Sequence, residues 1–229
     1  MATSSQKFGS MAAPLIVRHS VSEQVLSEMR KRIINGDLPA GNLLTESFCA
    51  NLLSVSRVPV REAMMALEKE GLIERDGRGR TVVRRYTLHD YQEILSLRQE
   101  LESMGARLAA THRSEEHLAA LEENIESFSR AENAEELARI DVDFHRLLIF
   151  SSGHQWLLRA WNTICSPYQW LLTRNFRAYI RATSLNESKI STEDHRRILE
   201  AIRQNKPIEA ELLMQQHISR WTEWTPPLE

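Results

Sequence analysis

Apolar residues spaced four positions apart predict three short helices near the amino end of the chain. The first helix begins near Val21 and stops before Gly36, and the second follows Thr45, whose side chain can cap it. The third follows Ser56, which takes the capping position, and ends at Gly71. The apolar positions that carry this spacing are Val21, Val25, Met29 and Ile33, then Phe48, Cys49, Leu52 and Leu53, then Val60, Met64 and Leu67.

The pattern changes after the third helix, where residues 72–75 and 81–85 alternate as short strands do. The turn sequence DGRG at residues 76–79 separates them, which indicates a hairpin. Three helices followed by a hairpin are the layout of a winged helix-turn-helix.

The remainder of the chain shows only helical periodicity. Amphipathic stretches cover residues 90–110, 115–129, 135–150, 155–181, 188–205 and 207–221. Pro167 should kink the fourth of these, and breaks are expected at 112–114, 151–154 and 205–207. The predicted fold is therefore mainly α: a disordered tail at 1–14, a winged helix-turn-helix at 15–86 and an all-helical bundle at 87–229.

Composition limits the class of protein and the kind of metal site. With 229 residues, 42% hydrophobic and 26% charged, the chain is typical of soluble globular proteins. It has no run of about 18 apolar residues and no secretory signal, so we expect no membrane partner and a cytoplasmic location. Because the only cysteines, Cys49 and Cys165, lie far apart, any metal must be held by histidines and carboxylates.

Charge is distributed unevenly between the two predicted domains. The net charge is −2, but residues 1–86 hold 13 basic and 9 acidic residues, and residues 87–229 hold 16 and 22. A basic amino-terminal domain joined to an acidic one hints at a nucleic-acid partner for the first domain.

The third helix and the hairpin carry the candidate DNA contacts. Arg57 and Arg61 lie four residues apart at the start of the helix, so both project from one face, as base-reading arginines do. Ser56 can reach a phosphate from the capping position. In the hairpin, Arg78 and Arg80 flank Gly79, where the absence of a side chain permits close approach to DNA. The alternative is that these arginines form a solvated face.

Residues 38–83, LPAGNLLTESFCANLLSVSRVPVREAMMALEKEGLIERDGRGRTVV, resemble the DNA-binding domain of the GntR family of transcriptional regulators. The shared motifs are the pG-x-x-L-x-E opening, the S-R-x-P-V-R-E helix and the L-x-x-x-G-L entry to the wing. The resemblance implies that Arg57 and Arg61 contact operator bases and that Gly79 lies at the wing tip. Two positions depart from the family pattern: Ser54 replaces the usual glycine, and Ser47 replaces an arginine that some relatives use on DNA.

Four residues of the carboxyl half could converge on one metal ion. Asp141 and His145 share a helix face, and His195 and His217 each lie eleven residues from Lys206, at the centre of a turn. Two antiparallel helices rising about 1.5 Å per residue would bring both imidazoles level, about 16 Å from that turn. Such ligands suit zinc, manganese, nickel or iron. The alternative is chance, because Asp-x-x-x-His pairs are common.

The carboxyl half also resembles the all-helical FCD effector domain of FadR-type regulators. The motifs are R-x-x-L/E at 98–102, D-x-x-F-H at 141–145, E-x-H-x-x-I-x-x-A-I at 193–202 and a late His217. In metal-binding members the ligands are an Asp and three His, which carry over to Asp141, His145, His195 and His217. The resemblance thus implies one divalent transition metal per chain, with zinc preferred. His154 should cap a helix, and surface positions are expected for His19, His89, His112 and His117.

A metal at the floor of a helical cavity could hold a small organic acid by its carboxylate. Arg98 is the first candidate for a second charge-assisted bond to that acid, and the alternative for Arg98 is a salt bridge with a glutamate of the bundle. Asn175, Arg177 and Ser191 are weaker effector-binding candidates.

The sequence favours a metabolite-responsive DNA-binding regulator, more specifically a repressor, over an enzyme. One winged helix-turn-helix domain reads one half-site, so we expect a homodimer on an inverted-repeat operator. Ligand binding is expected to shift the arrangement of the two DNA-binding domains. The alternative is a helical mononuclear metalloenzyme acting on a small carboxylate, with Glu193 or Asp194 as base. A di-iron bundle is disfavoured because no histidine has a Glu three residues before it. An interaction module using Trp221–Trp224 explains neither set of residues.

Overall fold

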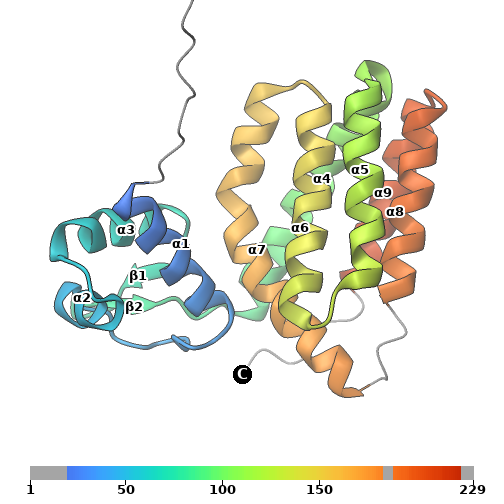
Figure 1. The fold of residues 1–229 in the computed structure, drawn as a ribbon. Coiled ribbons are helices and arrows are strands. Elements are labelled where there is room, and N and C mark those ends of the chain that lie inside the picture. The colour runs from blue at the N-terminus through green and yellow to red at the C-terminus, as the bar shows by residue number, and fades with distance from the viewer. Residues whose placement is uncertain (1–19, 183–187, 223–229) are drawn as a thin grey trace, which may run out of the picture.

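The computed structural model describes residues 20–182 and 188–222, except the side chains of 182–191 and 221–222. Two bodies lie side by side: a small head and a bundle of long helices (Figure 1). The mainly α fold, a winged helix-turn-helix followed by a helical bundle, is confirmed. The expected tail at 1–14, His19, the side chains of Ser191 and Trp221, and Trp224 lie outside the described part of the chain.

The head is built from three helices and a hairpin. The helices are α1 (Val21–Ile34), α2 (Glu46–Leu53) and α3 (Arg57–Lys69), and the strands are β1 (Ile73–Arg75) and β2 (Thr81–Val83). The strands pair antiparallel, with Glu74 opposite Val82, and an isolated bridge joins Leu43 to Val82. Of the apolar positions predicted from the four-residue spacing, Met29, Val60 and Leu67 are fully buried in the core of the head. Val21, Phe48 and Leu52 are exposed instead, so the predicted apolar faces extend beyond the core.

The predicted N-cap residues of α2 and α3 differ in whether their side chains form a capping hydrogen bond. The Thr45 side chain accepts the Phe48 amide at 3.1 Å and caps α2, as predicted. Ser56 takes the N-cap position of α3, as predicted, but its side chain makes no capping hydrogen bond. The exposed Ser56 hydroxyl is therefore available to another acceptor or donor.

Ser54 ends α2 in the left-handed conformation, with φ 55° and ψ 42°. Glycine adopts this conformation without steric cost, whereas a residue with a Cβ atom does not. Ser54 therefore replaces the usual glycine of the family at a position where the backbone conformation favours glycine. The backbone amide of Ser54 still bonds the Ala50 carbonyl, which preserves the tight turn into α3.

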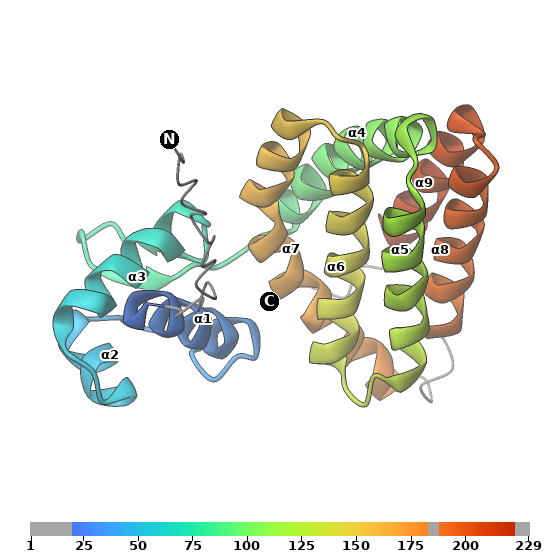
Figure 2. The same cartoon turned by 45° about the horizontal axis from the view of Figure 1, so that its top comes forward.

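The bundle consists of six helices and one short 3₁₀ turn within the described part of the chain. They are α4 (Leu88–His112), α5 (Glu115–Ser127), η1 (Phe128–Arg130), α6 (Ala134–Ser151), α7 (Gln155–Ala182), α8 (Ser188–Arg203) and α9 (Pro207–Thr222). Pro167 lies inside α7, whose ribbon changes direction along its length in both views (Figures 1 and 2). None of the described helices is both long and apolar enough to cross a membrane.

The helix α7 is the part of the bundle nearest the head, as both views show (Figures 1 and 2). The Ser166 hydroxyl donates to Glu70 Oε2 at 3.0 Å, and Glu70 also pairs with Arg30. Trp170 packs on Tyr86, with ring centroids 5.1 Å apart, and the Tyr86 hydroxyl donates to the Gly71 carbonyl at 2.6 Å. The end of α3 is thus tied to one turn of α7.

Candidate metal centre and DNA-binding surface

The predicted DNA-contacting residues are all exposed, and two of them, Arg61 and Arg80, line the same depression in the head. Arg57 lies in the first turn of α3 and Arg61 in the second, and both are exposed. A shallow depression runs from α3 to the hairpin and is lined by Thr45, Glu46, Arg61, Glu68, Arg75 and Arg80, among other residues. The helix α3, which is the predicted recognition helix, and the β1–β2 hairpin, which is the predicted wing, therefore share one face of the head.

The wing is shaped by an aspartate that the sequence interpretation did not single out. Asp76 Oδ1 accepts the amides of Arg78 and Arg80 at 2.9 and 2.8 Å, and its Oδ2 accepts from Arg80 Nε at 2.8 Å. Gly79, at φ 73°, has open space where a Cβ would be. The structure thus places Arg78, Gly79 and Arg80 at an exposed hairpin tip, with the Arg80 side chain held against Asp76.

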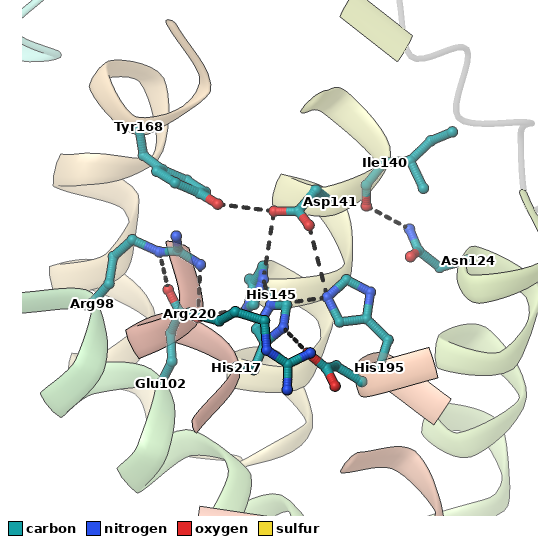
Figure 3. A network of polar contacts seen from close by, with 11 residues as sticks. Arg98, Glu102, Asn124, Ile140, Asp141, His145, Tyr168, His195, His217 and Arg220 are labelled. Carbon is teal, nitrogen blue, oxygen red and sulfur yellow. Dashed lines mark hydrogen bonds and ion pairs between the residues drawn. The ribbon is translucent and has the colours of Figure 1, made fainter. Parts of the chain in front are cut away.

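In the bundle, four predicted metal ligands come together from three helices. Asp141 and His145 lie on α6, His195 on α8 and His217 on α9, and all four are buried. Their ligand atoms all lie within 4.8 Å of one another. Figure 3 shows the three imidazole rings turned toward one another beside the Asp141 carboxylate.

The three imidazoles meet through their Nε2 atoms. His217 Nε2 lies 3.3 Å from both His145 Nε2 and His195 Nε2. The Asp141 carboxylate completes the group, with Oδ2 at 3.5 Å from His145 Nε2 and Oδ1 at 3.7 Å from His195 Nε2. The antiparallel α8 and α9 bring His195 and His217 level, as their equal distance from the turn predicted.

Carboxylates behind two of the rings decide which nitrogen carries the proton. His145 Nδ1 lies 2.5 Å from Glu102 Oε2, and His217 Nδ1 lies 3.4 Å from Asp194 Oδ2. A carboxylate only accepts, so each Nδ1 carries the proton and each Nε2 presents a lone pair. Two lone pairs facing each other at 3.3 Å repel, and a cation between them would turn that repulsion into coordination.

Burial favours the neutral form of His195 and of His217, which is the form that a metal ligand takes. It holds the pKa of His195 well below its usual value, and the neighbouring His217 and His145 lower it further. Burial also lowers the pKa of His217, although the hydrogen bond to Asp194 opposes that shift. The ring of His195 is fixed by Phe144, which stacks on it at 3.8 Å between centroids.

Each supporting carboxylate is itself held by an arginine. Arg98 donates to Glu102 through Nε at 2.5 Å and Nη2 at 3.1 Å, and Arg220 Nη1 donates to Asp194 at 2.7 Å. Burial alone would oppose ionisation of Glu102, but Arg98 and His145 outweigh it and lower its pKa to about 2. The Tyr168 hydroxyl donates to Asp141 Oδ2 at 2.9 Å, so each of Asp141, His145 and His217 has a polar partner behind it.

The structure separates three of the four effector candidates, since the side chain of Ser191 is not described. Arg98 is fully buried and forms the salt bridge with Glu102 that was its alternative role, yet its Nη1 has no hydrogen-bond partner among the described residues. The Asn175 side-chain amide donates to the Tyr91 hydroxyl at 3.0 Å. Arg177 binds Glu135 on α6 and the Asn35 carbonyl of the head, so it links head and bundle instead of facing the histidines.

The other histidines behave as expected wherever the structure describes them. His154 Nδ1 accepts the Leu157 amide at 3.1 Å and so caps α7. His89 and His112 are exposed and His117 is partly exposed.

Sequence reasoning did not assign roles to Tyr168, Arg220 or Glu102, and it considered Asp194 only as an enzymatic base. Only the four-residue spacing of Arg98 and Glu102 is visible along the chain. The others lie more than 20 residues from the groups they support, so no local pattern marks them.

Comparisons with known proteins cover both parts of the chain. Residues 21–83 match the family described as bacterial regulatory proteins, gntR family, and residues 93–220 match the FCD domain. An HTH-type transcriptional regulator of Bacillus subtilis, YdhC, described as uncharacterized, is 29% identical over 79% of this chain and 80% of its own. The gluconate operon transcriptional repressor of Bacillus licheniformis is 28% identical over 80% and 73%.

A solved structure, McbR/YncC of E. coli, shares the fold with a TM-score of 0.72. It covers 90% of this chain and 97% of its own at 19% identity. The two Bacillus relatives and the matched gntR family are transcriptional regulators, which confirms the regulator interpretation over the enzyme alternative.

The buried pair of Arg98 and Glu102 yields a stability prediction. Glu102→Gln leaves a buried guanidinium without its counter-charge, which typically costs about 3–5 kcal/mol of unfolding free energy. Chemical denaturation at pH 7 measures this loss. Asp143→Asn, which removes the carboxylate of the exposed pair with Arg139, is the matched control and should change stability little.

The loss should also depend on pH with a definite sign. Folding lowers the pKa of Glu102 from 4.5 to about 2, so its contribution is complete above pH 4.5 and is lost as pH falls toward 2. The difference between wild type and Glu102→Gln should therefore shrink over that interval. Equal losses in Glu102→Gln and Asp143→Asn at pH 7 would contradict the buried pair's role.

Proposed function

The chain belongs to the GntR family of bacterial regulatory proteins and carries an FCD domain, and from this premise we propose that it is a repressor controlled by a small organic acid bound beside a metal ion. The observation that carries the proposal is the pairing of two features in one chain. One is a head with an exposed, arginine-bearing recognition helix. The other is a buried group of three imidazoles and a carboxylate tied to that head through α7.

For DNA, the proposal assigns base reading to Arg57 and Arg61 and backbone contacts to Ser56 and the wing residues Arg78, Gly79 and Arg80. Guanidinium groups at the start of a recognition helix can bond guanine in two places, and a wing with an exposed glycine can approach the backbone closely. One head presents one such helix, so a homodimer on an inverted repeat is the arrangement we propose. The protein would act in the cytoplasm, where that DNA lies.

For the metal, we propose Asp141, His145, His195 and His217 as the ligands. Zinc takes imidazole nitrogens at about 2.0–2.1 Å in a tetrahedral arrangement, which sets neighbouring ligand atoms roughly 3.3 Å apart. The Nε2 atoms of His145 and His195 each lie 3.3 Å from that of His217, which supports zinc before manganese, nickel or iron. When bound, the ion supplies a coordination position for an effector carboxylate.

Arg98 is the residue that we propose to meet the effector beside that ion. Its guanidinium carbon lies 3.5 Å from the centre of the Tyr168 ring, whose hydroxyl bonds Asp141, and its Nη1 lacks a described partner. A second carboxylate or a hydroxyl of a small organic acid suits that donor. The name of the Bacillus licheniformis relative, which refers to a gluconate operon, supports a sugar acid or similar compound.

Control of DNA binding would pass through α7. Tyr168 bonds Asp141, and Ser166, two residues earlier on α7, bonds Glu70 at the end of the recognition helix. A change at Asp141 that moves Tyr168 therefore displaces the same turn of α7 that holds the head. We propose that ligand binding shifts the population of head positions by this route.

The DNA assignment predicts that sequences enriched by the protein from a random duplex pool contain an inverted repeat. Arg57→Ala and Arg61→Ala should each weaken binding to the enriched duplex by about 5–150-fold, because a bidentate arginine contact contributes about 1–3 kcal/mol of discrimination. Fluorescence anisotropy at fixed salt measures this, with Arg139→Ala on α6 as the control. Wild-type protein that binds enriched and unrelated duplexes equally would refute the assignment.

The metal assignment predicts about one ion per chain in protein purified without chelator. The double variant His195→Ala, His217→Ala should lose that ion, and the melting temperature should stop responding to EDTA. An ion present at 100 times its Kd adds about 2.7 kcal/mol to the native state. Elemental analysis measures content and identity, and His112→Ala on α4 is the control. Unchanged metal content in the double variant would exclude this site.

The coupling route predicts that Tyr168→Phe weakens the effect of metal on DNA binding. Removing one buried hydrogen bond typically costs about 1 kcal/mol, so the ratio of duplex affinities with and without EDTA should change by roughly fivefold. Tyr91→Phe removes a hydroxyl of equal burial that bonds Asn175 instead, and it should preserve the ratio. Equal ratios in wild type and Tyr168→Phe would rule out the route.

A further inference from the structure

An acidic side chain lies on the face of the head that carries the reading arginines. Glu46, the first residue of α2, binds Arg61 of α3 through two hydrogen bonds: Arg61 Nε to Oε1 at 2.7 Å and Arg61 Nη2 to Oε2 at 3.0 Å. The Arg61 side chain remains 66% exposed and that of Glu46 33% exposed. The pair therefore lies on the surface, where water competes with it.

Electrostatics alone disfavours a carboxylate at this place. Each phosphate of DNA is negative, so a nearby carboxylate weakens sequence-independent binding. The hydrogen bonds from Arg61 lower the pKa of Glu46, and the nearby charge of Arg57 lowers it further, so Glu46 stays ionised. A negative charge kept on this surface needs a compensating role.

The geometry of the two hydrogen bonds indicates that role. A guanidinium has two edges that can form paired hydrogen bonds, one made by Nε and Nη2 and the other by Nη1 and Nη2. Glu46 occupies the Nε edge of Arg61 and leaves the Nη1 edge free. The free edge has the paired donors that guanine O6 and N7 accept.

We propose that Glu46 is a positioning residue for DNA reading, which holds Arg61 so that its free edge faces a guanine. The inference rests on the proposed role of the head in DNA binding. A held guanidinium presents its donors in one orientation, whereas a free arginine on a flexible chain samples many. Glu46 thus raises the preference for the correct base at the expense of affinity for DNA in general.

The same depression holds a matched control. Glu68 of α3 faces Arg75 of β1 at 3.5 Å, so it carries the same charge on the same face but bonds a different arginine. Glu68→Gln changes the local charge as much as Glu46→Gln does and leaves the contacts of Arg61 intact. A difference between the two variants therefore reports on the positioning of Arg61 and not on charge.

The test uses the full-length protein and a duplex selected by the wild type from a random pool. Single-base variants of that duplex are first titrated with Arg61→Ala, and the base pair whose preference disappears is the one that Arg61 reads. Wild type, Glu46→Gln and Glu68→Gln are then titrated on the selected duplex, on the duplex changed at that base pair and on an unrelated duplex.

Glu46→Gln should reduce discrimination at that one base pair at least fivefold, while binding to the unrelated duplex stays equal or tightens. Glu68→Gln should retain the discrimination. In an Arg61→Ala background, Glu46→Gln should have no effect on base preference. Equal discrimination in wild type and Glu46→Gln would overturn the proposal, as would equal weakening on all three duplexes with a lowered melting temperature.

Failure of the underlying DNA role gives a different result. If Arg61→Ala retains every base preference of the wild type, Arg61 reads no base and the positioning role is excluded with it. If Arg61→Ala loses a preference that Glu46→Gln keeps, the DNA role stands and only the positioning role is excluded.

Discussion

The bundle is organised around a repulsion that its own residues create. Three imidazole Nε2 atoms and a carboxylate meet in the buried interior, and two carboxylates behind the rings direct lone pairs toward the common centre. Such an arrangement is unfavourable unless a cation occupies the centre or the surrounding helices hold the groups in place. The helices α4, α6, α7, α8 and α9 each supply a residue of this centre or one that bonds to it.

Residues behind the buried centre hold its polar groups in place. Arg98 binds Glu102, Arg220 binds Asp194, and Tyr168 binds Asp141, so each charged or polar group behind the centre has a partner of suitable chemistry. Buried ion pairs contribute little net stability, but they are costly to break. Their effect here is to orient His145, His217 and Asp141, whereas the ring of His195 is held by its stacking on Phe144.

The position of α7 relates this centre to the head. One turn of α7 carries Tyr168, which bonds Asp141, and Ser166, which bonds Glu70 at the end of α3. Side-chain hydrogen bonds also orient groups within the head: Asp76 bonds the wing, and Glu46 bonds Arg61. In the wing and on α3, an acidic side chain thus bonds groups that we propose to contact DNA.

The sequence by itself determined the elements and indicated the four residues of the proposed metal site. Periodicity located the helices and the hairpin to within about two residues at most ends, because each helix has an apolar face and a clear stop such as Gly36 or Gly71. The spacing of His195 and His217 about their turn, together with the family resemblance, indicated the four residues that the fold brings together.

Only the tertiary structure decided which distant groups support that site. Tyr168, Asp194 and Arg220 bond partners on other helices, and Arg177 bonds the head instead of facing the histidines. Such pairings depend on the relative rotation and offset of packed helices. Apolar periodicity specifies which face of a helix is buried but not which neighbour it meets, so these contacts have no signature along the chain.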